Sequence, residues 1–129
     1  MDFQHSVRTN LSFADAVARA RAALADEGFG VLTEIDVQKT LAEKIGADVA
    51  PYLILGACNP HLAHRALEVD ARVGVLLPCN VTVRVDDGRT VVSAMDPQVM
   101  TAFDGTDGLV PVATEAAQRI QRVLASFAN

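Results

Sequence analysis

The sequence has 129 residues, half of them hydrophobic, and its 11 lysines and arginines against 16 aspartates and glutamates give a formal net charge of −5. This length fits a single domain, spanning residues 1–129, whose core needs no disulfide or metal to hold it. The basic residues are scattered, and the chain contains one Tyr and no Trp. Because nucleic-acid binding needs concentrated positive charge and stacking surfaces, we expect no nucleic-acid partner.

Neither a membrane span nor a secretory leader is indicated. The longest apolar run, around residues 51–58, has the length of a strand and falls well short of the roughly 18–20 residues of a membrane span. The N-terminal sequence MDFQHSVRTN lacks the basic and apolar regions of a signal peptide. We therefore expect a cytoplasmic protein with no membrane partner, in which a reducing environment disfavours a disulfide between Cys58 and Cys79.

The first half of the chain predicts alternating strands and helices. Apolar and polar residues alternate near the N-terminus, as in a half-buried strand. Ser12 is a good N-cap for the helix that follows, and Gly28 supplies its left-handed stop. In chain order, the predicted elements are a strand at 3–9, a helix at 13–27, a strand at 29–35 and a short helix from Asp36 to Gly46.

The second half predicts mostly strands. The continuous apolar run at 51–57 indicates a strand buried on both faces. Asn59 is a suitable N-cap for a short helix with Pro60 in its first position, and Asp87-Gly88 forms a hairpin turn. The other predicted elements are strands at 73–78, 80–85 and 90–95, a helical turn at 97–103 capped at Asp96-Pro97, a loop at 104–108 and a last helix from Pro111.

This order of elements predicts an α+β fold, with helices packed on one face of a mainly antiparallel sheet. The opposite face then needs cover. The alternating Val81, Val83 and Val85, the apolar strand at 51–57 and the high apolar content suggest that a second copy of the chain supplies it. We therefore predict a homodimer.

Both cysteines stand in Cys-Asn pairs, Cys58-Asn59 and Cys79-Asn80. Cys58, His61 and His64 follow one another at three-residue intervals, and with Cys79 they offer two thiols and two imidazoles, ligand types that zinc accepts. Their spacing is not one of the common zinc patterns, however. We favour the histidines as ordinary surface residues and predict no metal site.

The thiols and the asparagines each have a structural and a functional explanation. Cys58 precedes a helix N-terminus, whose partial positive charge favours a reactive thiolate, whereas Cys79 is more simply a small buried hydrophobe. Asn59 is explained as an N-cap. Asn80, next to Pro78, either closes a strand ladder broken by a bulge or hydrogen-bonds a ligand.

Other candidate sites are weaker. His5 lies on the apolar face of the first predicted strand, where a packed core histidine is commoner than a catalytic base. The segment FDGTDG at 103–108 lacks the full calcium-loop pattern. The sequence contains no G-x-G-x-x-G, P-loop, G-x-S-x-G or H-E-x-x-H motif, so it assigns no catalytic residue and no cofactor.

The segment LILGACNPHLAHRALEVDARVGVLLPCNVTVRVDDG, followed by TVVSAMDP, resembles the core of the bacterial and archaeal family called domain of unknown function 302. The resemblance runs from about Phe13 to Leu124. It implies a fold similar to that of the TATA-binding protein, a curved, mainly antiparallel sheet with helices on one side, commonly dimeric. It implies no activity, since fold alone does not define function. The signature positions here are Cys58, Asn59, Pro60, His64, Leu77, Pro78, Cys79, Asn80, Asp96 and Pro97.

Two functions follow as hypotheses. We favour a dimeric small-molecule-binding module with a pocket near segments 56–64 and 77–80. The residues predicted to contact its ligand are Cys58, Asn59, His61, His64, Cys79 and Asn80. The alternative is a thiol-based redox or metal-handling protein that uses Cys58 and Cys79. That alternative requires the two thiols to be close, because a disulfide needs Cα atoms within about 7 Å.

Overall fold

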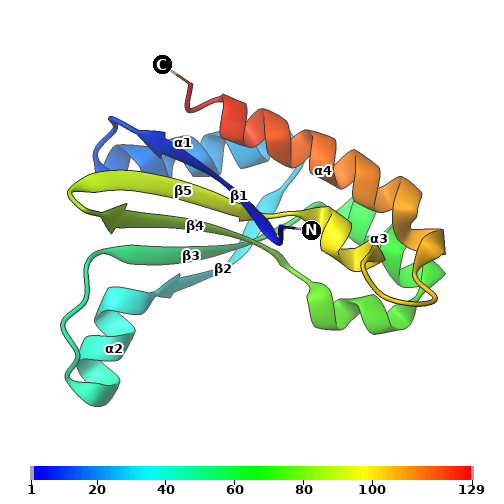
Figure 1. Ribbon diagram of the computed structural model, residues 1–129, viewed down its shortest axis with the longest axis horizontal. Coiled ribbons are helices and arrows are strands. Elements are labelled where there is room, and N and C mark those ends of the chain that lie inside the picture. The colour runs from blue at the N-terminus through cyan, green and yellow to red at the C-terminus, as the bar shows by residue number, and fades with distance from the viewer. Residues whose placement is uncertain (1, 129) are drawn as a thin grey trace.

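The computed structural model describes residues 2–128 and confirms the predicted α+β fold (Figure 1). Its strands form one antiparallel sheet in the order β1-β5-β4-β3-β2. The strands are β1 (Gln4–Thr9), β2 (Gly30–Asp36), β3 (Tyr52–Cys58), β4 (Cys79–Asp86) and β5 (Arg89–Met95). The α-helices are α1 (Phe13–Asp26), α2 (Val37–Ile45), α3 (Pro60–Val69) and α4 (Val110–Ala125), and the 3₁₀ helices are η1 (Ala71–Leu76), η2 (Pro97–Thr101) and η3 (Asp107–Leu109).

One face of the sheet is covered by α1 and α4 (Figure 1). The register pairs Val81 with Leu55 and Val83 with Val92, and all four side chains are fully buried. Each such side chain contributes about 1.5–3 kcal/mol through burial. They pack with helix residues that include Ala16, Ala20, Leu24, Ile120, Val123 and Leu124.

This packing corrects two expectations about the sheet. Two of the three valines of β4 that were expected to be covered by a partner, Val81 and Val83, are buried against the chain's own helices, while Val85 is half-buried. In β3, Leu53 and Leu55 are buried on that same face, whereas Tyr52 and Ile54 are half-buried on the other face. The strand is therefore covered on one face, and the homodimer stays a prediction without the support of these valines.

A second apolar cluster lies beyond the ends of β3 and β4, where α3, η1 and η2 meet the first turns of α4 (Figure 1). Its members are Leu62, Ala66, Val73, Met100, Leu109, Val112, Ala113 and Ala116. Helix α2 lies apart from both clusters. It lies next to the edge strand β2, away from α1 and α4, and none of its residues is buried (Figure 1).

The predicted helix caps are present. The Ser12 side chain accepts a hydrogen bond from the backbone N of Asp15 at 3.1 Å, and Asp36 accepts one from Lys39 at 2.9 Å. Gly46 ends α2 in the left-handed conformation, with φ 67°. Short polar side chains at the first turn and a glycine at the last are local signals, which explains why the sequence places these helices within one or two residues.

The segment 73–78, predicted as a strand, is instead largely the 3₁₀ helix η1. Asp70 begins this helix, because its Oδ1 accepts a hydrogen bond from the backbone N of Arg72 at 3.0 Å. Val73 is 3% exposed and Val75 is 89% exposed. Residues two apart would share one face of a strand, so this contrast shows a helical turn that the apolar composition of the segment concealed.

The bulge that the sequence predicts at Pro78 is not found there. Strand β4 begins after Pro78, which follows Leu77 through a cis peptide bond, and the pairing of β3 with β4 runs without a shift. The irregularity of the sheet falls in β2, between Val31 and Thr33. Asn80 therefore has no broken ladder to close.

Within residues 2–128, no helix combines the length and the apolar character that crossing a membrane requires.

Candidate functional site

The two Cys-Asn segments lie next to each other in the fold. Strands β3 and β4 pair so that Ala57 stands opposite Cys79 and Gly56 opposite Asn80. Cys58, at the end of β3, follows directly on this pair. The antiparallel ladder therefore brings together two segments that are 21 residues apart in the sequence.

Cys58 and Cys79 line one small apolar cavity. Its volume is about 30 Å³. A single water needs about 10–15 Å³ measured in this way, whereas ligand pockets typically measure about 300–1,000 Å³. Its other walls come from residues that include Phe29, Leu62, Leu77, Met100 and Ala116. The space accommodates a water or two and excludes a metabolite.

The chemistry of Cys79 is that of a protonated thiol. Burial, with a smaller contribution from the neighbouring Cys58, raises its pKa to about 11. Since the thiolate is the nucleophile and the metal ligand, Cys79 is inert at neutral pH. Cys58 is half-buried, and both cysteines are free thiols.

The two histidines stand apart from the thiols. His61 and His64 are exposed on α3, and neither lines the cavity. His64 Nε2 lies 3.2 Å from Glu68 Oε1, one turn further along the helix. Among residues 2–128, no three His, Cys, Asp or Glu side chains gather closely enough to hold a metal ion. The two-thiol, two-imidazole set is not assembled.

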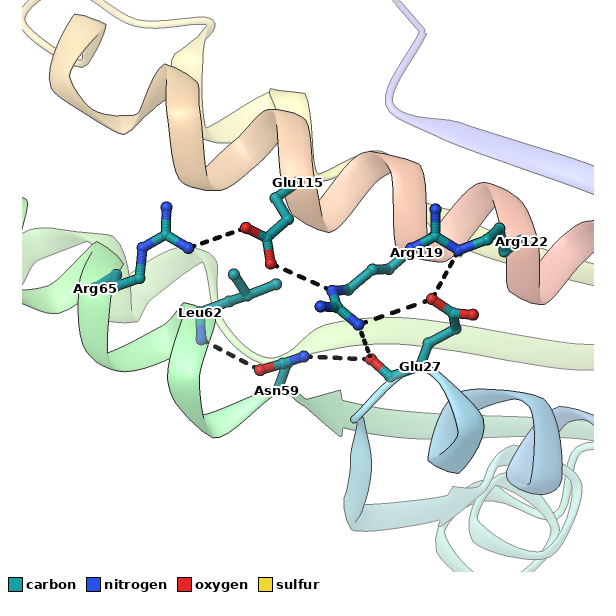
Figure 2. Close-up of polar contacts among 7 residues, drawn as sticks. All are labelled: Glu27, Asn59, Leu62, Arg65, Glu115, Arg119 and Arg122. Carbon is teal, nitrogen blue, oxygen red and sulfur yellow. Dashed lines mark hydrogen bonds and ion pairs between the residues drawn. The ribbon is translucent and has the colours of Figure 1, made fainter.

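Asn59 joins two helices (Figure 2). Its Oδ1 accepts a hydrogen bond from the backbone N of Leu62 at 3.2 Å, which caps α3, and its Nδ2 donates to the carbonyl O of Glu27 at 3.3 Å, just after α1. Gly28 lies against this contact with φ +84°, and a Cβ there would stand 2.9 Å from Asn59 Nδ2. Both ends of the Asn59 amide are thus used by the fold.

The same network extends to α4 (Figure 2). Arg119 Nη1 also donates to the carbonyl O of Glu27, at 3.1 Å, while the Glu27 carboxylate accepts from Arg122 Nε at 2.9 Å. Glu115 accepts from Arg65 at 3.1 Å and from Arg119 at 3.3 Å, and the hydrogen bond from Arg65 is the main cause that lowers the pKa of Glu115. We interpret this network as structural, because its hydrogen bonds connect α1, α3 and α4. From the sequence, the four-residue spacing of Glu115 and Arg119 was its one visible signal.

Asn80 faces the side of the sheet that α1 and α4 leave open. Along β4, Asn80, Thr82 and Arg84 alternate with the buried valines. They lie in an open groove of about 520 Å³, a size typical of ligand sites. Of the six residues predicted to contact a ligand, this groove contains Asn80, whereas the cavity contains Cys58, Asn59 and Cys79.

The strand register orders the groove into rows of side chains. Across β1, β5, β4 and β3, the first row is Arg8, Val91, Arg84 and Tyr52, and the second row is Ser6, Ser93, Thr82 and Ile54. The third row contains Gln4, Met95, Asn80 and Gly56. The β4 member of each row lines the groove, and exposed Phe3 lies at its third-row end. The other row members that line it are Gln4, Ser6, Tyr52, Ser93 and Met95.

Sequence reasoning missed this groove because it requires the register. The polar positions of NVTVRV and the small polar Ser93 of TVVSAM alternate with apolar residues, which is a visible signal for an exposed face. The turn at Asp87-Gly88 pairs Thr82 with Ser93. Strand β1 adds Gln4 and Ser6 to the groove from the N-terminal end of the chain, and no local sequence signal indicates that it pairs there.

His5 and Asp96 form a pair at the edge of the sheet. His5 Nε2 lies 2.9 Å from Asp96 Oδ2, and Asp96 Oδ1 accepts a hydrogen bond from the backbone N of Gln98, also at 2.9 Å. The His5 side chain is 42% exposed, so it is not the packed core histidine that the sequence suggested. Asp96 does cap a helical turn as predicted, here η2.

These features define a sheet-and-helix domain with a sealed apolar side and an open polar groove. The chain belongs to the DUF302 family: the model described as "Domain of unknown function DUF302" matches residues 5–127. The crystal structure of an uncharacterized conserved protein DUF302 from Bacillus stearothermophilus is similar, with a TM-score of 0.92 and 28% sequence identity over 99% of this chain and 100% of that chain. No curated protein matches the chain significantly. The resemblance inferred from the sequence is confirmed, and the family carries no named activity.

Proposed function

We propose that this protein is a small-molecule-binding module and that its ligand occupies the groove on the open face of the sheet. The observation that carries this proposal is the groove itself, a hollow of about 520 Å³ lined by amide, hydroxyl and guanidinium groups from several strands. A site with polar groups placed on a rigid sheet is well suited to orient a ligand.

The sizes of the two hollows favour the groove over the cavity as the place of the proposed ligand. The cavity at Cys58 and Cys79, at about 30 Å³, is too small for a metabolite. Asn80 belongs to one of the two Cys-Asn segments and lies in the groove. The predicted pocket near segment 77–80 is thus retained in this proposal, on the opposite face of β4 from Cys79.

A groove-filling variant tests the proposal. We expect Thr82→Trp to fill the centre of the groove and to abolish the shifts in melting temperature that compounds from a metabolite library produce in the wild type. Thr114→Trp, on the exposed surface of α4, is the matched control and should keep them. If no compound shifts the wild-type protein, or if the shifts survive in Thr82→Trp, the proposal is wrong.

We further propose that the protein is a homodimer that associates through β2 and α2. Strand β2 is an edge of the sheet, and edge strands are ready to pair. Leu32, Ile35 and Ile45 are 69%, 47% and 73% exposed on these two elements. Isolated helices shorter than about 12–15 residues are marginal in water, and the nine-residue α2 buries none of its residues. A second copy would supply the missing cover and leave the groove open.

Sedimentation velocity tests this association. We expect a dimer for the wild type at micromolar concentration and a monomer for Ile45→Lys. Val75→Lys, which changes an even more exposed apolar residue on η1, at 89%, is the control and should stay dimeric. A monomeric wild type, or a dimeric Ile45→Lys variant, would contradict the proposal.

The thiol-based alternative has one favourable observation, that Cys58 and Cys79 border the same cavity. The raised pKa of Cys79 weighs against it. It requires rapid alkylation of a cysteine by iodoacetamide at pH 7, or zinc or copper in the purified protein by elemental analysis. We also propose that the protein is located in the cytoplasm, where cysteines stay reduced, because both of its cysteines are free thiols.

A further inference from the structure

We propose that the groove selects small organic anions and that Arg84 is the residue that anchors them. This inference rests on the proposed function and assigns the class of its ligand. Its starting point is a contrast in charge. The chain has a formal net charge of −5, yet among residues 2–128 the groove lining contains Arg84 and no carboxylate.

The guanidinium of Arg84 has N–H donors that are available to a ligand. Arg84 Nη1 lies 3.7 Å from Asp86 Oδ2, which is beyond hydrogen-bond distance, and that oxygen is closer to Arg8 Nη2, at 3.2 Å. A guanidinium carries five N–H donors in a fixed planar arrangement that matches a carboxylate or a phosphate. The Arg84 side chain is 33% exposed, so a ligand can reach it while part of the surrounding water is excluded.

Neighbouring side chains fit the same ligand class. Tyr52 stands directly opposite Arg84 on β3, where side chains are close enough to act on one group, with Cβ atoms about 4.5–5.5 Å apart. Its hydroxyl is a donor, as is the hydroxyl of Thr82 in the next row, whereas the Ser93 hydroxyl is hydrogen-bonded to Ser6 at 2.7 Å. An anion bound at Arg84 would therefore meet hydroxyl donors, and the carboxylate that Arg84 pairs with at 3.7 Å, that of Asp86, lies closer to Arg8, at 3.2 Å.

The opposite end of the groove has a different character. Met95 and the 72%-exposed Phe3 bring apolar surface to it, and Asn80 adds an amide. From Arg84 to Asn80 the strand advances four residues, about 13 Å. The groove thus runs from a cationic end to an apolar end over the length of a small metabolite. We infer a ligand with an anionic group at one end and an apolar body.

Three probes of similar length test the charge preference: 4-phenylbutyrate, its neutral amide and 4-phenylbutylamine. Binding is followed by backbone amide chemical shifts in ¹⁵N-labelled full-length protein. We expect saturable shifts of Thr82, Arg84 and Ser93 with 4-phenylbutyrate, and at least tenfold weaker binding of the amide and the amine. Phenyl phosphate forms a separate arm. Binding of either anion supports the proposal, and the tighter one identifies the carboxylate or the phosphate.

Variants assign the anchor. Arg84→Gln should weaken 4-phenylbutyrate at least tenfold, and Arg84→Lys, which keeps the charge, should weaken it less. Arg21→Gln is the matched control, because Arg21 is also partly exposed, at 40%, and lies on α1. If the neutral amide binds as tightly as the acid, or if Arg84→Gln leaves the affinity unchanged, the anion inference is wrong while the binding function stands. If no probe and no library compound shifts the groove residues, both are wrong.

Discussion

The two faces of strands β3 and β4 differ, because one is packed under helices and the other is open. Cys79 and Asn80 are consecutive residues, yet one borders a cavity of about 30 Å³ among apolar side chains and the other lies in an open groove of about 520 Å³. The period of two in a strand is the cause, because successive side chains point to opposite faces. Residues that are adjacent in the sequence can therefore divide between the packed core and an open surface.

The comparison also separates two kinds of polar residue. Asn59 has both ends of its amide bonded within the fold, whereas Asn80 is exposed. The network around Glu27 and Arg119 belongs with Asn59, since it ties helices together. The helix-covered side therefore accounts for stability, and the open side is where we propose that a ligand binds.

The largest expected effect compares neighbouring residues of β3. Leu55→Ala removes a fully buried side chain on the helix-covered face and should lower the free energy of unfolding by about 2–5 kcal/mol. Ile54→Ala, on the half-buried open face, should cost less than half as much. Urea denaturation measures both. Equal losses would show that the open face is as fully packed as the other.

A substitution at Gly56 tests how closely Thr33 and Pro78 approach this glycine. A Cβ there would overlap Thr33 Oγ1 and stand 3.0 Å from Pro78 Cγ, so Gly56→Ala should cost about 1–3 kcal/mol through overpacking. At Gly30 the nearest atom would be 4.0 Å away. Gly30→Ala is therefore the control, and its melting temperature should change less. A larger loss at Gly30 would contradict the structure here.

Cys79 makes the sealed side sensitive to alkaline pH. Because burial raises its pKa from 9.0 to about 11, the folded state holds the thiol proton more tightly than the unfolded state. Its contribution is complete below pH 9 and is lost as the pH rises through 11. We expect the wild type to lose about 1 kcal/mol more than Cys79→Val between pH 8 and pH 10. Parallel losses in urea denaturation of the two proteins would rule out a buried thiol.

The smallest effect concerns Asp70, at the start of η1. Hydrogen bonds from the Arg72 side chain and backbone lower the pKa of Asp70 from 3.8 to about 2. A lowered pKa in the folded state gives stability that is present above pH 3.8 and is lost as the pH falls through 2. The melting temperatures of wild type and Asp70→Asn should therefore converge between pH 4 and pH 2. A constant difference over this range would show that Asp70 and Arg72 are not coupled.

Local signals predicted the fold well, and pairing between distant segments explains what they missed. Ser12, Asp36 and Asn59 cap their helices as expected, since a cap involves residues two or three apart. The segment after Asp70 was wrongly predicted as a strand, because its apolar composition suits a buried strand and a 3₁₀ helix equally.

The candidate site was predictable in part. The sequence pointed to the Cys-Asn segments, and the fold does place them side by side. It gave no means of seeing that Asn80 shares a groove with Ser93 and Gln4 of other strands, because that depends on the register of β1 and β5. From the sequence, Arg84 is one of several scattered basic residues, and only the strand register places it in the groove.

The most direct test of the account is a chemical-shift map of the wild-type protein titrated with 4-phenylbutyrate. If the open groove is the binding site, the shifts fall on Tyr52, Thr82, Arg84 and Ser93, while Leu62, Ala66 and Met100 around the thiol cavity stay unchanged. Shifts centred on those cavity residues, with the groove residues unaffected, would contradict the division between a sealed face and a binding face.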